Sequence, residues 1–266
     1  MLSVPKICFL YWNNAPMSYL HTVTLTSFHR LNPDWEIKVY NFIYPDEPSY
    51  APKYNHYHGE DFFPKVRNMD FVEVIDLTMP SHDVHSILIS DIWRRQILFE
   101  NGGVYSDFDV IWLKPASHLK NIEFIGDYEK AVSVVSYYEL TKSFHNVSIL
   151  ISEKGNDFDK TIIEAQKNVR LLYDDQAFGT TLLNWMYPEF ENIPFPVLGV
   201  PYETFYPYST YDLKKLFIEN DLSVITNNTL AVHWFNGNPL SKMFINNNLY
   251  HTECSINTII KNYVEN

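Results

Sequence analysis

Two aspartates separated by one phenylalanine, Asp107 and Asp109, are the residues whose type and spacing most directly indicate chemistry in this chain. In a strand, successive side chains point to opposite faces, so both carboxylates would share one face and Phe108 would take the other. Two carboxylates held side by side repel each other unless a cation lies between them. The pattern therefore predicts a divalent cation site, with a pair of solvated acids at a strand end as the alternative.

A hard divalent cation such as Mn²⁺ or Mg²⁺ is commonly bound by one or two carboxylates together with water and substrate phosphates. Two aspartates are too few ligands for a permanent site, so we expect a phosphorylated substrate to supply the others. The formal net charge of −12 argues against nucleic acid as a partner, because nucleic acid is held mainly by lysine and arginine. A small anionic ligand that arrives with a cation is compatible with that charge.

The segments around the aspartates alternate between strand and helix, which is typical of a single α/β domain with a mainly parallel sheet. In such sheets ligands bind at the carboxyl ends of the strands, and the aspartates are expected at one such end. Besides the strand with the aspartates, strands are expected at residues 6–11, 36–40, 72–75, 131–137, 147–151 and 230–234. Helices are expected at residues 18–30, 84–100, 157–169, 175–185 and 255–263.

Gly102 and Gly103 follow the helix that precedes the aspartates, and a pair of glycines in a chain with only 8 indicates a turn that requires them. The whole chain, 1–266, is expected to be one domain with an irregular insertion at about 41–70. Loops of this kind are usually lids or mobile functional segments, with surface irregularity as the alternative. His56 and His58 have no third metal ligand nearby, which favours a solvated loop.

No apolar stretch approaches the length of a membrane span, and the N-terminus does not have the pattern of a targeting signal. We therefore expect no transmembrane segment and a cytoplasmic location. Cys8 and Cys254 lie near opposite ends of the sequence and are expected to be buried thiols rather than a disulfide.

The stretch SDIWRRQILFENGGVYSDFDV, residues 90–110, resembles the signature of glycosyltransferase family 32, the DXD sugar-binding family. That family includes initiating mannosyltransferases of the Golgi and capsular polysaccharide enzymes. The blocks VPKICFLYW, NPDWEIKVYN, FHNVSILISEKGNDFDKTI, TFYP and AVHWFNG are similar to other parts of the family, so the resemblance covers most of the chain outside the insertion. Two segments depart from it: Gly179-Thr180 replaces a Gly-Pro pair, and NGNPLSK replaces a small residue followed by tryptophan. These departures affect the expected acceptor rather than the metal or the fold.

The resemblance implies a GT-A (Rossmann-like) fold, a UDP- or GDP-linked sugar donor and a divalent metal, usually Mn²⁺. It also implies transfer of a hexose, with retention of configuration, to a saccharide or other hydroxyl acceptor in polysaccharide biosynthesis. Asp109 matches the residue that binds the metal, and Asp107 the one that contacts the donor and the metal's water shell. Asp91 and Arg94 match a helix pair that faces the donor, and Trp12 an aromatic residue near the base. From the residues alone, an ordinary helix ion pair is the alternative for Asp91 and Arg94, and a core position is the alternative for Trp12. Golgi members carry a membrane anchor that this sequence lacks, so their location is not expected here.

Three further residues are assigned to the site. Tyr105, the aromatic residue before the aspartate pair, is expected at the donor site. Asp175 is a conceivable catalytic nucleophile at the start of a helix, although N-capping fits the same position and we favour same-face attack assisted by the donor phosphate. His233 ends a late strand, and the family has a histidine in this block. It is expected to complete the metal shell or to bind the leaving phosphate, with a core histidine as the alternative.

Together, these residues indicate a metal-dependent glycosyl transfer. Cleavage of a sugar–diphosphate bond leaves negative charge on the nucleotide, and a cation held by the two aspartates would neutralise it. The aromatic loop at 202–211 is expected to help hold the acceptor, because aromatic faces pack well on sugar rings. Two other classes stay open. A metal-dependent phosphohydrolase would need further clustered ligands, and an inactive carbohydrate- or nucleotide-binding module would not need the intact Asp-x-Asp.

Overall fold

The computed structural model of the chain describes residues 2–44, 57–79, 86–139, 141, 143–144, 147–169 and 177–265. Its strands are β1 (Ile7–Trp12), β2 (Glu36–Ile43), β3 (Val72–Thr78), β4 (Gly103–Ser106), β5 (Val110–Trp112), β6 (Ser133–Tyr137), β7 (Ile149–Ser152), β8 (Val197–Pro201) and β9 (Ala231–His233). Its α-helices are α1 (Tyr19–Leu31), α2 (Phe63–Val66), α3 (Ser86–Asn101), α4 (Asp157–Gln166), α5 (Thr180–Met186), α6 (Leu213–Phe217), α7 (Pro239–Asn246) and α8 (Ser255–Ile260).

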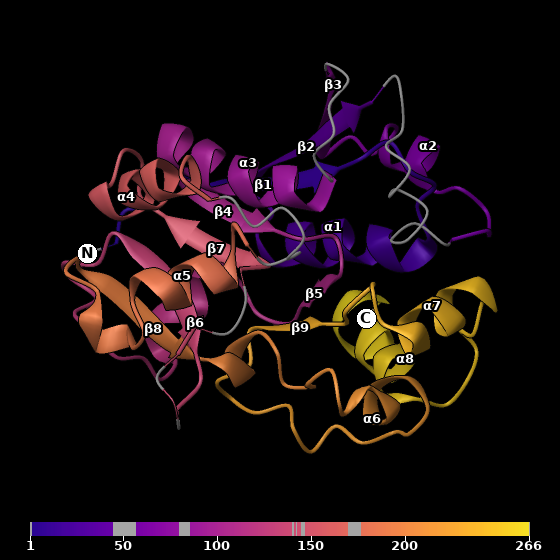
Figure 1. The fold of residues 1–266 in the computed structure, drawn as a ribbon. Coiled ribbons are helices and arrows are strands. Elements are labelled where there is room, and N and C mark those ends of the chain that lie inside the picture. Colours follow the sequence, from indigo (N-terminus) through magenta and orange to yellow (C-terminus); the bar gives the residue numbers. More distant parts are fainter. Residues whose placement is uncertain are drawn as a thin grey trace.

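Most of the strands form one sheet in the order β3-β2-β1-β4-β7-β6-β8 (Figure 1). β1 is parallel to β2 and β4, β2 to β3, and β6 to β8, whereas β7 is antiparallel to both of its neighbours. All strands of this sheet except β7 therefore have their carboxyl ends at one edge. β5 and β9 form a separate antiparallel pair. The expectation of an α/β chain with a mainly parallel sheet is confirmed.

The core lies on both faces of the large sheet, and β1 shows how the sequence divides between them. Cys8 and Leu10 belong to the buried cluster that contains Phe28 of α1. Phe9, between them, belongs to the cluster that contains Leu98 of α3 and residues of α4 and α5. This is the alternation expected of a strand that is covered on both sides. A third cluster joins β5 and β9 to α1 and to α6, α7 and α8, which Figure 1 shows grouped beside β9.

The two glycines after α3 allow the chain to turn into β4. Gly102 and Gly103 have φ angles of +70° and +112°, a region that favours glycine. A Cβ on Gly102 would lie 2.8 Å from the backbone nitrogen of Lys154, and one on Gly103 would lie 2.6 Å from the carbonyl oxygen of Ile7. Both positions therefore need glycine for conformation and for space. The sequence pattern correctly indicated a required turn.

Several elements differ from those expected. β2 and β3 run on to Ile43 and Thr78, whereas α4 ends early at Gln166. The helix expected from residue 175 begins at Thr180, and residues 177–179 form a turn. β8, α6 and α7 were not expected at all. β8 contains a glycine and a proline, which are depleted in strands. α7 begins with Pro239, and the side chain of Asn238 accepts a hydrogen bond from Leu240 N–H, so a helix-start signal was present there.

Part of the expected insertion lies outside the described residues, namely positions 45–56, which include His56. The described part contains the end of β2 and all of α2. Cys8 and Cys254 are free, buried thiols, as expected. In the part of the chain that the structure describes, none of the helices has both the length and the apolar character needed to cross a membrane.

Candidate active site

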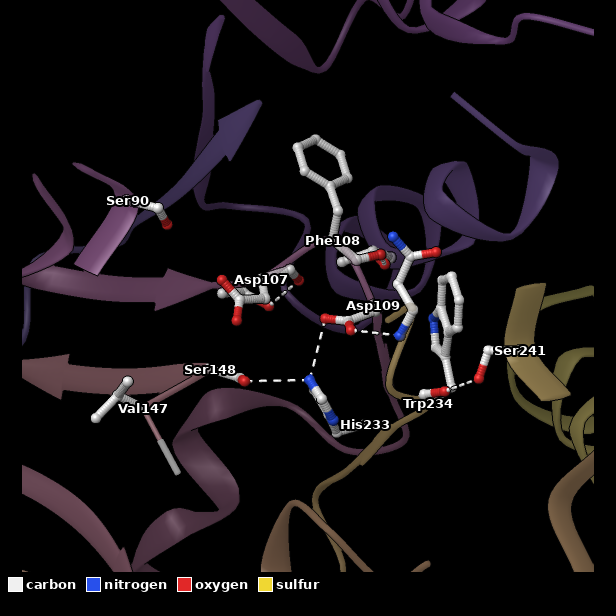
Figure 2. Close-up of polar contacts among 12 residues, drawn as sticks. Ser90, Asp107, Phe108, Asp109, Val147, Ser148, His233, Trp234 and Ser241 are labelled. Carbon is white, nitrogen blue, oxygen red and sulfur yellow. Dashed lines mark hydrogen bonds and ion pairs between the residues drawn. The ribbon is translucent and has the colours of Figure 1, made fainter. Parts of the chain in front are cut away.

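Asp107 and Asp109 lie in a turn between strands of two different sheets. β4 ends at Ser106 and β5 begins at Val110, so the expectation that both aspartates belong to one strand was wrong. Phe108 is only 4% exposed, and its ring packs edge-on against that of Trp12 with centroids 5.1 Å apart. Figure 2 shows both carboxylates directed away from the Phe108 ring. The buried phenylalanine therefore turns the carboxylates to a common side, without the alternation of a strand.

Each carboxylate oxygen of Asp109 has a partner. Oδ1 lies 3.1 Å from His233 Nε2, and Oδ2 accepts a hydrogen bond of 2.8 Å from the backbone N–H of Asn236. The carbonyl oxygen of Asp109 accepts another, also of 2.8 Å, from Trp234 N–H. Burial raises the pKa of Asp109, but His233 and the Asn236 N–H outweigh burial and hold this pKa below its usual range. The carboxylate is therefore ionised at neutral pH.

β9 brings His233 to the aspartate turn, because the β5–β9 ladder pairs it with Val110. The imidazole is 4% exposed, and its Nε2 lies 3.1 Å from Ser148 Oγ as well as facing Asp109 (Figure 2). The rings of Tyr206 and Phe235 pack edge-on against it, with centroids 5.3 and 4.2 Å away. These contacts fix the ring with Nε2, the nitrogen that would bind a metal, toward the Asp109 carboxylate.

The three residues predicted to bind metal are brought together. One possible ligand atom from each of Asp107, Asp109 and His233 lies within 4.8 Å of the others. The 3.1 Å between Asp109 Oδ1 and His233 Nε2 matches the spacing of about 3 Å between adjacent ligands of an octahedral ion with ligand distances of about 2.1 Å. The side chains of Asp107 and Asp109 are 25% and 16% exposed, so a ligand can reach them from solvent. The residues present fit a divalent cation.

Asp107 is oriented by buried neighbours. Tyr105 donates a hydrogen bond of 2.6 Å to Asp107 Oδ1, and Arg94 Nη2 lies 3.4 Å from the same oxygen. The backbone N–H of Asp107 donates to the carbonyl oxygen of Ser148 at 2.8 Å. Burial raises the pKa of the Tyr105 hydroxyl, which therefore stays protonated and keeps its donor role. Tyr105 is 1% exposed, so its part in the site is to hold Asp107.

Arg94 is a buried residue of α3 that contacts the aspartate turn. Its Nη2 lies 2.9 Å from Asp91 Oδ1, and its Nη1 donates to the carbonyl oxygen of Val147 at 2.7 Å. Burial lowers the pKa of the guanidinium, but Asp107, Tyr105 and Asp91 raise it by more, so Arg94 keeps its charge. The side chains of Arg94 and Asp91 are 6% and 4% exposed. The helix ion pair exists, but it is a buried one that supports Asp107.

Asp91 also packs against the turn before α5. A Cβ on Gly179 would lie 3.0 Å from Asp91 Oδ2 and 2.9 Å from Val147 Cγ2. Gln166 Nε2 donates to the carbonyl oxygens of Asp91, at 3.2 Å, and Phe178, at 2.9 Å. Glycine at position 179 therefore lets the turn approach the buried carboxylate.

Trp12 is part of the support behind the turn. Its side chain is 9% exposed, and its indole N–H donates to the carbonyl oxygen of Ala15 at 2.8 Å. Asp175, in contrast, lies outside the described residues, so its role stays a prediction. Reasoning from sequence missed Ser148 and the backbone N–H of Asn236. Neither has a signal in the sequence, because a serine in a strand is common and a backbone N–H is not encoded by residue type.

Residues 4–132, a little under half of the chain, match the family model described as a glycosyltransferase sugar-binding region containing a DXD motif. Among solved structures, the chain is similar to the PaToxG glycosyltransferase, with 17% identity, a TM-score of 0.46 and coverage of 70% of this chain and 71% of that one. It is also similar to GlyE of Streptococcus pneumoniae TIGR4, with 14% identity, a TM-score of 0.46 and coverage of 86% and 55%. It is similar as well to the galactosyltransferase LgtC in complex with donor and acceptor sugar analogues, with 16% identity, a TM-score of 0.44 and coverage of 86% of this chain and 86% of that one. These likenesses are too distant to assign a function by themselves. No curated protein matches the chain.

Proposed function

We propose a metal-dependent hexosyl transfer as the reaction of this chain, because residues 4–132 match the model of a glycosyltransferase sugar-binding region that contains a DXD motif. The donor is a UDP- or GDP-linked hexose, and the acceptor is a hydroxyl group of a saccharide or another molecule. The observation that carries the proposal is the convergence of Asp107, Asp109 and His233 at the carboxyl end of β4. Such a site suits a nucleoside diphosphate, whose phosphates complete the shell of a divalent cation.

Asp107, Asp109 and His233 would hold the cation, which when bound supplies the Lewis acid that neutralises charge on the departing diphosphate. An imidazole in the donor set favours a transition ion such as Mn²⁺ over Mg²⁺, which prefers oxygen ligands. Arg94 and Tyr105 would hold Asp107, since both contact its Oδ1. Ser148 would hold the His233 ring. We propose that the sugar keeps its configuration because the acceptor attacks from the same face that the diphosphate leaves. A glycosyl adduct on Asp175 in mass spectra would contradict this proposal.

A screen of nucleotide sugars for Mn²⁺-dependent hydrolysis tests the proposal, because a transferase without acceptor can pass the sugar to water. The expected products are the nucleoside diphosphate and the free sugar. A phosphohydrolase would instead give the nucleoside monophosphate and a sugar phosphate. An inactive binding module would give neither while still binding the nucleotide. Absence of turnover with every UDP- and GDP-linked hexose would contradict the proposal.

Replacing His233 by alanine is expected to raise the Mn²⁺ concentration for half-maximal hydrolysis by at least about tenfold, since even outer-shell changes cost tenfold or more in metal affinity. Its Nε2 lies 3.1 Å from Asp109 Oδ1. Replacement of the exposed His251 by alanine is the matched control and should leave that concentration unchanged. An unchanged metal requirement together with a lowered melting temperature would return His233 to a purely structural role.

The acceptor is expected to bind at three tyrosines that we call the tyrosine surface: Tyr138, Tyr202 and Tyr211. Tyr138 and Tyr202 directly follow β6 and β8, and Tyr211 is within electrostatic reach of Tyr138. Tyr138 and Tyr211 are 40% and 96% exposed, and the Tyr138 and Tyr202 rings have centroids 4.9 Å apart. β6 and β8 run in the same direction as β4, so their carboxyl ends share the sheet edge with the aspartate turn. Exposed aromatic rings are suited to packing on pyranose rings.

A short stretch of chain connects the tyrosine surface to the metal ligands. The N–H of Tyr206 donates to the carbonyl oxygen of Tyr202 at 2.8 Å, which is the spacing of a single helical turn. The Tyr206 ring in turn packs against His233. The rest of the aromatic loop is inaccessible, because Phe205, Tyr206 and Tyr208 are at most 1% exposed. A saccharide that reaches the donor sugar can therefore lie across the tyrosine surface.

Replacing Tyr211 by alanine is expected to raise the KM for a saccharide acceptor by about three- to tenfold, as loss of about 1 kcal/mol of apolar contact would. The KM for the nucleotide sugar should change less. Trp185 on α5 is 78% exposed, and its replacement by alanine is the matched control for losing an exposed aromatic ring. Equal changes in acceptor KM for the two variants would place the acceptor elsewhere.

A further inference from the structure

A buried histidine, His21, lies behind the segment that closes over Asp109. It is on the first turn of α1 and is 2% exposed. Its ring is packed edge-on between those of Trp12 and Trp234, each with its centroid 5.1 Å away. Since Trp12 supports Phe108 and Trp234 binds the backbone of Asp109, His21 touches both flanks of the aspartate turn. The reaction proposed above gives His21 no role.

The hydrogen bonds of His21 fix where its proton lies. Nδ1 accepts the backbone N–H of Ser18 at 3.2 Å and lies 2.7 Å from Ser18 Oγ. A backbone N–H can only donate, so Nδ1 carries no proton and the neutral ring is protonated at Nε2. Burial lowers the pKa of His21 to about 4, although the Asp109 carboxylate acts against burial. The ring is therefore a neutral N–H donor at neutral pH.

The Nε2–H of His21 is the polar group of the ring that Ser18 does not bind. The nitrogen is buried and has no hydrogen bond of ordinary geometry within the described residues, although a side-chain hydrogen bond with Asn236 is among the contacts that raise the pKa of His21. The groups that raise the pKa of His21 include the Asp109 carboxylate and the side chain of Asn236, so both lie within electrostatic reach. A buried N–H without a partner is uncommon and calls for an explanation. The side-chain amide of Asn236, whose oxygen can accept this hydrogen bond, is the candidate partner.

The segment from Trp234 to Asn236 needs such support. It binds Asp109 twice, through the N–H groups of Trp234 and Asn236. Between them, Phe235 has a φ of +53°, which is unfavourable for a bulky residue and persists only where its surroundings hold it. Ser241 Oγ fixes one end by donating to the carbonyl oxygen of Trp234 at 2.7 Å (Figure 2). The other end, at Asn236, is the one whose side chain contacts His21.

We propose that His21 is a positioning residue for the metal site, whose Nε2–H holds the Asn236 side chain. Asn236 N–H then keeps Asp109 Oδ2 engaged and leaves Oδ1, which faces His233, to bind the cation. This inference rests on the proposed function, because it gives His21 a purpose only if Asp109 binds a metal. It assigns no contact with substrate to His21, which is too deeply buried for one.

Two replacements that each keep one half of the imidazole test this role. In His21→Gln the side-chain amide reaches the place of Nε2, whereas in His21→Asn it reaches only the place of Nδ1. Binding of Mn²⁺ to the protein alone is measured from the electron paramagnetic resonance signal of free Mn²⁺. We expect His21→Gln to bind within about twofold of the unaltered protein and His21→Asn to bind about tenfold more weakly, the lower end of outer-shell effects. Equal affinities for the two variants would overturn the proposal, whatever their melting temperatures.

A double-mutant cycle with Asn236→Ala tests whether His21 acts through the Asn236 side chain. If it does, His21→Asn combined with Asn236→Ala should bind Mn²⁺ no more weakly than the weaker single variant. Independent, additive losses would overturn the proposal. Hydrogen exchange of the metal-free protein gives a second readout, in which His21→Asn, but not His21→Gln, should speed exchange in the peptide that contains Asn236. If the unaltered protein binds no Mn²⁺, the proposed metal site fails together with this inference. If it binds and the variants do not differ, only the role of His21 fails.

Discussion

Replacing Asp109 by asparagine is expected to lower Mn²⁺-dependent hydrolysis of the nucleotide sugar by at least about a hundredfold. The exchange removes one unit of charge from the place where Asp109 Oδ1 faces His233. The fold should persist, because an amide oxygen can still accept the hydrogen bond from Asn236 N–H. Activity with and without Mn²⁺ and a melting curve on the same preparation measure both effects.

The matched control is Asp127→Asn, since Asp127 is an exposed residue whose partner is Lys130 on the surface. It should alter neither hydrolysis nor metal dependence. Nucleotide binding measured by calorimetry adds a second comparison, in which Asp109→Asn should abolish the difference between titrations with and without Mn²⁺. If the unaltered protein binds the nucleotide equally well in both conditions, the metal has no part in donor binding.

Replacing Arg94 by methionine is expected to lower the free energy of unfolding by about 3–5 kcal/mol, the cost of leaving a buried charge without its partner. Arg94 lies 2.9 Å from Asp91, whose side chain is 4% exposed, and 3.4 Å from Asp107. The variant should also lose metal-dependent hydrolysis, because Asp107 loses one of the two groups that orient it. Arg94→Lys should not restore stability, since an ammonium group cannot reproduce the contacts of the planar guanidinium with Asp91 and Val147.

The comparison variant is Arg67→Met, because Arg67 forms a half-exposed ion pair with Asp76. Urea unfolding should show a loss of at most about 1 kcal/mol for that variant. Combining Arg94→Met with Asp91→Asn should recover part of the stability, since it removes the buried carboxylate that has lost its arginine. A change of less than about 1 kcal/mol for Arg94→Met alone would mean that water or a neighbouring group replaces the guanidinium.

The fold class and the membership of the metal cluster could be predicted from the sequence, but the geometry could not. Alternating strand and helix patterns indicate a mainly parallel sheet, yet they do not encode the reversed direction of β7, because side-chain period is the same in both directions. Asp107 and Asp109 were expected to share a side through strand alternation. They do so because Phe108 is buried in a turn. The sequence thus predicted that these two carboxylates lie together, but for a local geometry that the structure does not have.

Burial was the property hardest to predict for the site. Arg94 on an amphipathic helix is expected at the surface, since arginine is rarely buried unless it is paired. Here it is buried because two acceptors from outside its own helix, Asp107 and the carbonyl oxygen of Val147, converge on it in addition to Asp91. Such convergence depends on tertiary structure and leaves no local pattern. The same reason applies to His21, whose position behind Asp109 depends on segments far from it in the sequence.

The aspartate turn joins two sheets, and this sets a limit on how the chain can be divided. The family match ends at residue 132 and includes β5, but the strand that pairs with β5 is β9, at 231–233. A fragment cut after the matched region would keep both aspartates and lose His233, the Trp234 and Asn236 hydrogen bonds and the only ladder partner that β5 has in the described chain. The segment that matches the family model is therefore not an autonomous binding module. Reassembly of two separately produced halves would be needed to rebuild the cation site.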